Sequence, residues 1–173
     1  MSTPETRLPS DVSAVVRHFL TAELTTVSRS GHPITWPVLP SLEEGSFRIS
    51  IVTSIGLPQK ALNIRRDPRV SLLYSDSTGS GLTDPPLVRV EGRATAPDVV
   101  LTSIGQIEDR GIAAAFERDA IELLRRQPAV GIYTSNSLAR KLMDWYFLRL
   151  LIVVEPTRVS WGIDDRWEAV DVA

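Results

Sequence analysis

The chain has 173 residues, of which 43% are hydrophobic, and a formal net charge of -2, so its composition is that of one globular domain. It has no cysteine and only two histidines, which excludes a zinc or haem-iron site of the usual kind built from its own side chains alone. No apolar run reaches the roughly 18 residues of a membrane span, the N-terminus lacks a signal-peptide pattern, and no basic block suits nucleic acid. We therefore expect a cytoplasmic protein with a single domain over residues 1–173 and no metal, membrane or nucleic-acid partner.

The first third of the sequence predicts one helix followed by three strands. Ser10 is a good N-cap, and apolar residues recur at helical spacing after it, which predicts a helix over 11–21 that covers an open end of a sheet. Runs rich in β-formers over 23–28 and 33–39 predict a hairpin, and strict alternation predicts a third strand over 47–53. The helix residues expected to face inward are Val12, Val15, Val16, Phe19 and Leu20.

The middle of the sequence predicts short elements separated by breaks. A helix over 58–66 ends at an Asp-Pro step, because a residue before proline is disfavoured in the α region. Strands are expected over 70–74 and 87–96, with Gly92 as a bulge point in the second. The segment 76–86 between them is rich in Ser, Gly, Asp and Pro, which is typical of a loop.

The C-terminal half predicts helices and then one long strand. Helices are expected over 97–104, over 112–127 and from about 137 to 142. The final strand covers 147–161 and is interrupted at Pro156. The residues of the second of these helices that are expected to face inward are Ala115, Phe116, Ile121 and Leu124.

Together these elements predict a mainly β fold. Six strands in near-meander order, with helices between the third and fourth and between the fifth and sixth, favour an antiparallel barrel over a parallel sheet. A lipocalin-like barrel for an apolar ligand is an alternative, but helices that interrupt the strands count against it.

Lys60 is the residue that most strongly suggests a ligand. Almost all of the 19 basic residues are arginine, and Lys60 lies near the start of the helix that follows the third strand. Helix N-termini present unsatisfied N–H groups and the positive end of the macrodipole, so a flexible ammonium there suits a phosphate. The structural alternative is a solvated helix lysine, which is the usual fate of lysine.

A longer motif surrounds this lysine. Lys60 to Arg69 is similar to a stretch Lys-x-x-Asn-Leu-Arg-Arg-Asp-Pro-Arg, with Ile64 in the leucine position. Supporting matches are a hairpin at 31–37, a Val-Arg-Val-Glu-Gly strand at 88–92 and a Trp-Gly pair at 161–162. In these features and in the order of its elements, the chain resembles the FMN-binding split barrels of the pyridoxamine 5'-phosphate oxidase-like superfamily. The resemblance covers most of residues 19–166, and it implies a six-stranded antiparallel split barrel.

The resemblance implies a homodimer with a flavin-type cofactor, FMN or the deazaflavin coenzyme F-420, in each of two clefts at the subunit interface. It implies that Lys60 contacts the cofactor phosphate with Gln59 beside it, that Trp161 approaches the ring, and that Trp36 lines the substrate side. Backbone N–H groups of the third strand can donate to ring acceptors. The residues that line the ring and ribityl chain are then Ser50, Ile51, Val52, Thr53 and Ser54.

Two departures from the family pattern bear on the activity. The oxidase itself has an arginine where this chain has Gln59 and a glutamine where it has Leu87, so the chain is expected to be a relative rather than that oxidase. Our first hypothesis is an oxidoreductase that passes hydride between its cofactor and a small organic molecule. The second is a non-enzymatic split-barrel dimer that binds a flavin or a haem-like ligand. Neither hypothesis assigns a catalytic side chain.

Several polar residues of the motif also have structural interpretations. Arg65, Arg66 and Arg69 suit the C-terminal end of a helix, or alternatively the oligoglutamate tail of F-420. Asn63 is expected to bond a cap or a turn, and His32 lies in a turn where a catalytic role is the minority interpretation.

The dimer is also expected from the final strand. Its apolar run is too continuous for a strand with one wet face, so both faces need cover, which an obligate interface would supply. The residues of this run are Leu148, Leu150, Leu151, Ile152 and Val153.

Overall fold

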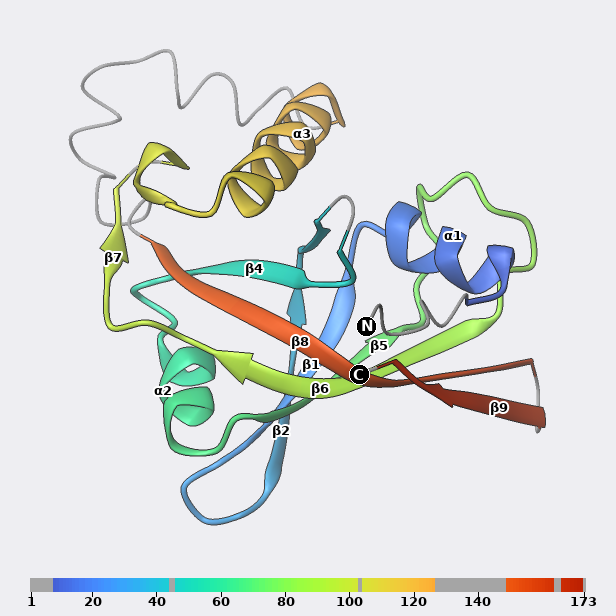
Figure 1. Ribbon diagram of the computed structural model, residues 1–173, viewed down its shortest axis with the longest axis horizontal. Helices are drawn as coiled ribbons and strands as arrows, with labels where there is room; N and C mark the ends of the chain where they lie inside the picture. The colour runs from blue at the N-terminus through green and yellow to red at the C-terminus, as the bar shows by residue number, and fades with distance from the viewer. Residues whose placement is uncertain (1–7, 44–45, 103, 127–148, 164–165, 173) are drawn as a thin grey trace, which may run out of the picture.

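The computed structural model describes residues 8–43, 46–102, 104–126, 149–163 and 166–172 (Figure 1). In chain order its elements are α1 (Ser10–His18), β1 (Ala22–Val27), β2 (Pro33–Val38), β3 (Pro40–Leu42), β4 (Ile49–Ser54), α2 (Gln59–Arg66), β5 (Arg69–Tyr74), β6 (Leu87–Thr95), β7 (Val100–Leu101), the 3-10 helix η1 (Ile104–Gln106), α3 (Arg110–Arg126), β8 (Arg149–Ile163) and β9 (Arg166–Asp171).

The strands form one antiparallel sheet that curls into an open, split barrel (Figure 1). Its order is β2-β1-β5-β6-β8-β4-β3, and β7 and β9 pair with other parts of β8. The two edge strands, β2 and β3, follow one another in the chain with Leu39 alone between them, so the edges of the sheet lie together. The predicted mainly β, antiparallel barrel is confirmed, with nine strands in the described residues where six were expected. The additional strands are β3, β7 and β9.

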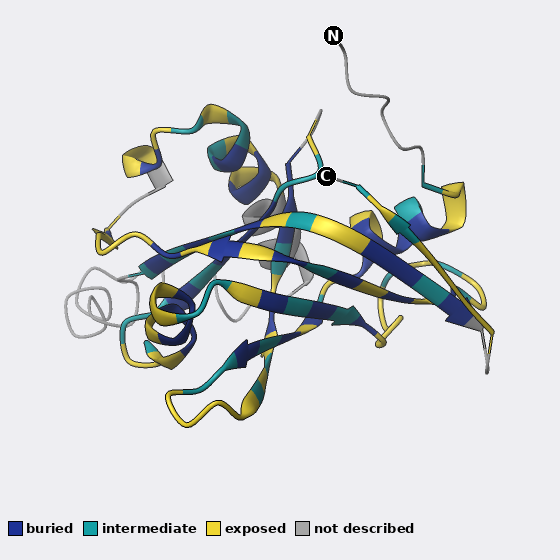
Figure 2. Ribbon diagram, turned by 60° about the horizontal axis from the view of Figure 1, so that its bottom comes forward, coloured by how far each residue is buried: buried dark blue, intermediate teal, exposed yellow. Residues whose placement is uncertain are grey.

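Buried residues alternate with more exposed ones along several strands (Figure 2), and the buried side chains form the core of the barrel. In β5 and β6 every second residue is buried, as the two-residue period of a half-buried strand requires. Helix α1 closes one end of the barrel and buries Val12, Val15 and Val16, and Phe19 follows them into the core. The predicted amphipathic cover of the sheet is therefore present.

Helix α1 differs from the prediction at both ends. Ser10 is the first helical residue rather than the N-cap, and Pro9 takes the cap position without a side-chain cap bond. Proline suits the start of a helix because its fixed φ already matches the first turn. Leu20 was predicted to face inward, but the helix ends at His18 and Leu20 is 36% exposed.

Gly92, the predicted bulge point, lies where the pairing of β6 with β8 shifts register. It pairs with Pro156, whereas the preceding β6 residue pairs with Arg158, so Thr157 is left out of the register. A Cβ at Gly92 would lie 2.3 Å from the carbonyl oxygen of Glu155, so a glycine is required here. The bulge lets β8 continue through Pro156, and the predicted interruption of this strand is wrong.

The predicted helix over 97–104 is wrong as well, because this segment contains β7 and the start of η1. Arg65 of α2 donates to the carbonyl oxygens of Ala96 and Pro97, each at 2.7 Å, and pairs with the Asp98 carboxylate at 2.7 Å. These three contacts hold the segment extended. The helix predicted from about 137 to 142 lies outside the described residues.

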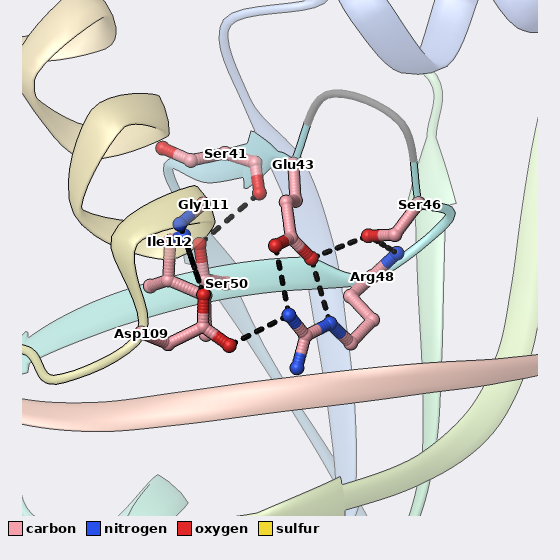
Figure 3. A network of polar contacts seen from close by, with 8 residues as sticks. All are labelled: Ser41, Glu43, Ser46, Arg48, Ser50, Asp109, Gly111 and Ile112. Atoms are coloured by element: carbon pink, nitrogen blue, oxygen red, sulfur yellow. Dashed lines mark hydrogen bonds and ion pairs between the residues drawn. The ribbon is translucent and has the colours of Figure 1, made fainter.

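Helix α3 is fixed to the β3–β4 hairpin by a network centred on Arg48 (Figure 3). The Arg48 guanidinium donates to the Glu43 carboxylate at 2.6 and 2.7 Å and to Asp109 at 2.7 Å. Asp109 also accepts from the backbone N–H groups of Gly111 and Ile112 at 3.0 and 3.2 Å, so it caps the first turn of α3. Hydrogen bonds from Arg48 lower the pKa of both carboxyl groups.

Helix α3 covers part of the apolar run of β8. Leu150 and Ile152 face the main core, whereas Leu151 and Val153 face a second apolar cluster beneath α3. Part of the cover that this strand needs therefore comes from its own chain. The other members of the second cluster are Val52, Leu101, Ile107, Ile112, Ala113 and Phe116. Ala115 and Phe116 are buried as predicted, whereas Leu148 and the side chains of Ile121 and Leu124 lie outside what the structure describes.

Tyr74 gives a direct test of the core. It is fully buried, its ring meets Phe19 edge-on with centroids 6.3 Å apart, and its hydroxyl has no hydrogen-bond partner among the described residues. Burial raises the pKa of this phenol. Since an unsatisfied buried hydroxyl costs about 1–3 kcal/mol, we expect Tyr74→Phe to raise the free energy of unfolding in urea by about 1 kcal/mol.

The matched control is Phe19→Leu, which removes the ring contact and leaves the hydroxyl in place. It is expected to lower the free energy of unfolding by about 1 kcal/mol. A Tyr74→Phe variant less stable than the unmodified chain would show that the hydroxyl has a partner.

Candidate functional site

The predicted site lies at the seam where the two edges of the sheet meet. Strand β3 pairs only with Ile49–Ile51 of β4, so within the described residues the edge of β4 from Val52 to Ser54 has no partner strand. Four residues of turn then lead into α2. Strand β2 forms the opposite edge of the sheet. The seam is therefore bordered by β2, by the unpaired half of β4 and by α2.

Lys60, on the first turn of α2, is buried at this seam with 6% of its surface exposed. It is the only lysine or arginine of the described part of the chain that is buried. Its Nζ lies 5.0 Å from the ring centroid of Trp36, a cation–π distance, and the structure gives this ammonium no ion pair or hydrogen bond to any described residue. Burial lowers the pKa of the Lys60 ammonium. A buried cation without an anion is a candidate anion site.

Trp36 lies on β2 opposite Leu24, a fully buried residue of β1. The indole is half-buried, and its Nε1–H is buried with no acceptor among the described residues. The contact between Trp36 and Lys60 was not predicted from the sequence, because it joins separate elements. The pairing of an aromatic on the edge strand with the helix lysine is therefore a finding of the structure.

The predicted β4 residues have different roles. Ile51 is fully buried in the core, so its side chain is unavailable to a ligand. The Ser50 hydroxyl donates to the carbonyl oxygen of Ser41 at 3.2 Å, and the Thr53 hydroxyl donates to that of Leu57 at 3.3 Å. Ser54 Oγ accepts from the N–H of Gly56 at 3.2 Å. Side chains of this strand hold the hairpin and the turn, so a ligand at its edge would meet mainly backbone. Val52 packs under α3.

A hydrogen-bond chain anchors α2 to β1 and thereby positions Lys60. Asn63 is fully buried, and its Nδ2 donates to Thr26 Oγ1 at 3.0 Å. Its Oδ1 accepts from Gln59 at 2.8 Å and from Arg66 at 2.9 Å. Asn63 therefore bonds between elements, and Gln59 is a partner of Asn63. Thr26 was not singled out from the sequence, where it is one threonine in a β-rich run.

The arginines of the motif all bond to their own chain. Arg65 bonds the segment before β7, as described above, and Arg66 also donates to the carbonyl oxygen of Val27 at 2.9 Å. Arg69 pairs with Asp67 at 2.6 Å, which lowers the pKa of that carboxyl to about 2. Their structural interpretation is thus supported, and Lys60 differs from them in having no oxygen partner among the residues that the structure describes.

Trp161 lies far from Lys60. Ser54 pairs with Arg149 at the start of β8, and Trp161 is twelve residues further along, about 40 Å at roughly 3.3 Å per residue. Figure 1 shows β9 and α2 at opposite ends of the molecule. Any contact of Trp161 with a ligand at Lys60 therefore requires a second subunit.

A hollow of about 380 Å³ occurs at the β9 end of the sheet and includes none of the predicted residues. Arg158 beside it pairs with Asp171 at 3.0 Å, and Arg89 lies 3.8 Å from Glu91. The residues that line it are Arg89, Arg158, Ser160, Trp167, Glu168 and Ala169.

In the described part of the chain, neither His32 nor a group of acidic residues forms a metal site. His32 is exposed in the β1–β2 turn, where its backbone N–H donates to Ser28 Oγ at 3.0 Å. Within the described ranges no group of three or more His, Asp or Glu residues is arranged to hold a metal ion, and none of the helices is long and apolar enough to cross a membrane.

No protein-family model and no curated protein sequence matches the chain. Solved structures do resemble it. A haem-binding protein from Mycobacterium smegmatis is 20% identical with a TM-score of 0.56, over 96% of this chain and 60% of its own. A second structure is that of a Clostridium acetobutylicum protein of the pyridoxinephosphate oxidase family, related to general stress protein 26. It is 9% identical with a TM-score of 0.56, over 92% of this chain and 91% of its own. An F-420 reductase is 19% identical with a TM-score of 0.51, over 88% of this chain and 98% of its own. At these identities the likeness establishes the fold.

The lowered pKa of Lys60 predicts a dependence of stability on pH. A group whose pKa lies below its ordinary value of 10.5 in the folded chain holds fewer protons there than in the unfolded chain, so stability rises with pH through that interval. We expect Lys60→Met to be more stable than the unmodified chain at about pH 7, by about 1 kcal/mol, and this advantage to shrink toward about pH 10.

Urea denaturation of both chains at several pH values measures the difference. Tyr74, whose pKa is also shifted, is present in both and cancels. An advantage that stays constant with pH would mean that Lys60 has an ordinary pKa in the folded chain.

Proposed function

We propose that this chain, which has the split-barrel fold of the pyridoxamine 5'-phosphate oxidase-like proteins, is an oxidoreductase that binds a flavin-type cofactor and passes hydride to or from a small organic molecule. The observation that carries the proposal is Lys60, a buried lysine whose ammonium has no anion among the described residues, on the helix that follows the unpaired edge of β4 after a four-residue turn. A phosphate would supply the missing charge, and charge-assisted bonds of this kind contribute about 1.5–3 kcal/mol each.

The residues at the seam fit such a cofactor. Lys60 would hold the phosphate, and the backbone of β4 from Val52 to Ser54, which lacks a partner strand among the described residues, would face the ribityl chain and ring. The cofactor itself supplies the hydride chemistry when bound. The protein then binds and orients it and excludes water. Gln59 and Leu87, which replace family residues, argue against oxidation of pyridoxamine phosphate itself.

FMN suits the structure better than coenzyme F-420. Both place a phosphate on a ribityl-type chain, so Lys60 serves either. The oligoglutamate tail of F-420 would need further cations, and the arginines next to Lys60 already bond their own chain. Because an F-420 reductase is among the structural neighbours, the deazaflavin is the alternative cofactor.

Titration of cofactor-stripped protein with FMN and, separately, with F-420 tests the proposal. We expect one of them to bind with a dissociation constant in the micromolar range or below. The change in cofactor fluorescence measures this binding. Lys60→Gln is expected to weaken it at least tenfold, which is about 1.4 kcal/mol. Arg29→Gln, in the exposed β1–β2 turn, removes the same charge as a control and should leave affinity unchanged. Failure of both cofactors to bind would overturn the proposal.

A homodimer is part of the proposal. Large apolar side chains stand exposed on both sides of the seam, as they would at a surface that another subunit covers. Leu57 and Leu62 flank the start of α2, at 60% and 45% exposure, and Leu39, which joins β2 to β3, is 49% exposed. Trp161 of the partner would then be the copy that approaches the ring.

Light scattering at micromolar concentration should therefore give the mass of a dimer. Leu57→Glu with Leu62→Glu is expected to shift the protein to monomer and to weaken cofactor binding with it. A stable monomer of the unmodified chain would contradict the shared site.

A second candidate function is non-enzymatic binding of a flavin or a haem-like ligand. It is favoured by the contacts of Lys60, which in the described residues include an aromatic ring but no carboxylate or histidine that could move a proton. The haem-binding neighbour from Mycobacterium smegmatis has a similar fold. Reduction of bound cofactor by a nicotinamide donor, followed by turnover with an acceptor, would exclude this candidate.

A further inference from the structure

Two donors that lack acceptors meet at the seam of the barrel. One is the ammonium of Lys60 and the other is the indole N–H of Trp36. We propose that Trp36 Nε1–H is a second hydrogen-bond donor to the anion that Lys60 binds. Trp36 thereby belongs to the anion end of the site. The identity of the anion as a cofactor phosphate rests on the proposed function, whereas the pair of donors does not.

The case begins with the cost of an unpaired donor. Nearly all buried N–H groups in proteins have a partner, and a buried tryptophan usually finds one for its indole. Trp36 Nε1 has none in the described residues, and the same is true of its neighbour Lys60. Both groups donate and neither accepts, so they cannot satisfy each other. One oxyanion at the seam would satisfy both.

The geometry allows this. The ammonium lies over the face of the ring, 5.0 Å from its centroid, while an indole N–H lies in the ring plane and points outward from its edge. The two donors therefore approach the edge of the ring from different directions. Because Nε1 is covered in this structure, a tetrahedral oxyanion accepts from both donors, each through a different oxygen, once the atoms that cover Nε1 move aside. Lys60 has a flexible four-carbon stem, so its ammonium is the group that moves when the anion enters.

If Trp36 had only a structural role, its indole N–H would not be needed. A phenylalanine at this position would also pack beside the buried Leu24 and lie under the ammonium. Phenylalanine differs from tryptophan in that it lacks the indole N–H and has a smaller ring. Trp36→Phe is therefore the informative substitution, and Lys60→Gln is its companion.

The test uses the full chain, inorganic phosphate as the probe and nuclear magnetic resonance of indole N–H groups labelled with nitrogen-15. The Trp36 signal is assigned through its backbone and by its absence in Trp36→Phe. We expect it to move on titration with phosphate while the indole signals of Trp161 and Trp167 stay in place. Trp36→Phe should bind phosphate and FMN at least tenfold more weakly, with unfolding in urea used to confirm that it folds.

An indole signal that does not respond to phosphate, or unchanged affinity in Trp36→Phe, would overturn the inference. The titration of the unmodified chain decides the question without the variant. Normal FMN binding by Trp36→Phe would remove this inference and leave the proposed function standing. A phosphate-dependent shift of Trp36 in a protein that binds neither FMN nor F-420 would remove the proposed function and leave the pair of donors.

Discussion

The site depends on one unusual constraint, a buried lysine whose ammonium has no negative charge beside it among the described residues. Desolvation of an ammonium is costly unless a partner compensates it, and the ring of Trp36 compensates only in part. Every other basic residue of the motif has an oxygen partner in the chain. The exception falls at the seam where the sheet leaves half of β4 unpaired. A buried lysine and an unpaired strand edge that a short turn joins in the chain are the physical basis of the binding proposal.

The surrounding structure keeps that cation in place. Asn63 bonds α2 to Thr26 of β1, and Arg65 ties the same helix to the segment before β7. On the other side of β4, the network of Arg48, Glu43 and Asp109 fixes α3 against the hairpin. Lys60 therefore projects from a helix that Asn63 and Arg65 anchor to neighbouring elements, and it follows a strand whose Val52 packs under α3. The backbone that carries Lys60 is therefore preorganised, and binding needs only its side chain to adjust.

The sequence predicted what depends on local pattern. Alternation located β4, the proline at position 68 ended α2, and Gly92 identified the bulge in β6. It did not predict features set by distant partners. The start of the segment 97–104 is held by Arg65 and its middle pairs with β8 as β7, and β9 forms only because β8 is long enough to hold it. The site was predicted at Lys60 through its motif. Its contact with Trp36 was missed, because two elements that the sequence separates by more than twenty residues meet only in the closed barrel.

The central claim is that Lys60 holds the phosphate of a flavin-type cofactor. The most direct measurement is phosphorus-31 nuclear magnetic resonance of FMN bound to the unmodified chain and to Lys60→Gln, each at saturation. If Lys60 holds the phosphate, the phosphate resonance is displaced from its free position in the unmodified chain and returns toward that position in the variant. The same displaced resonance in both proteins, or a resonance that never leaves its free position, would contradict it.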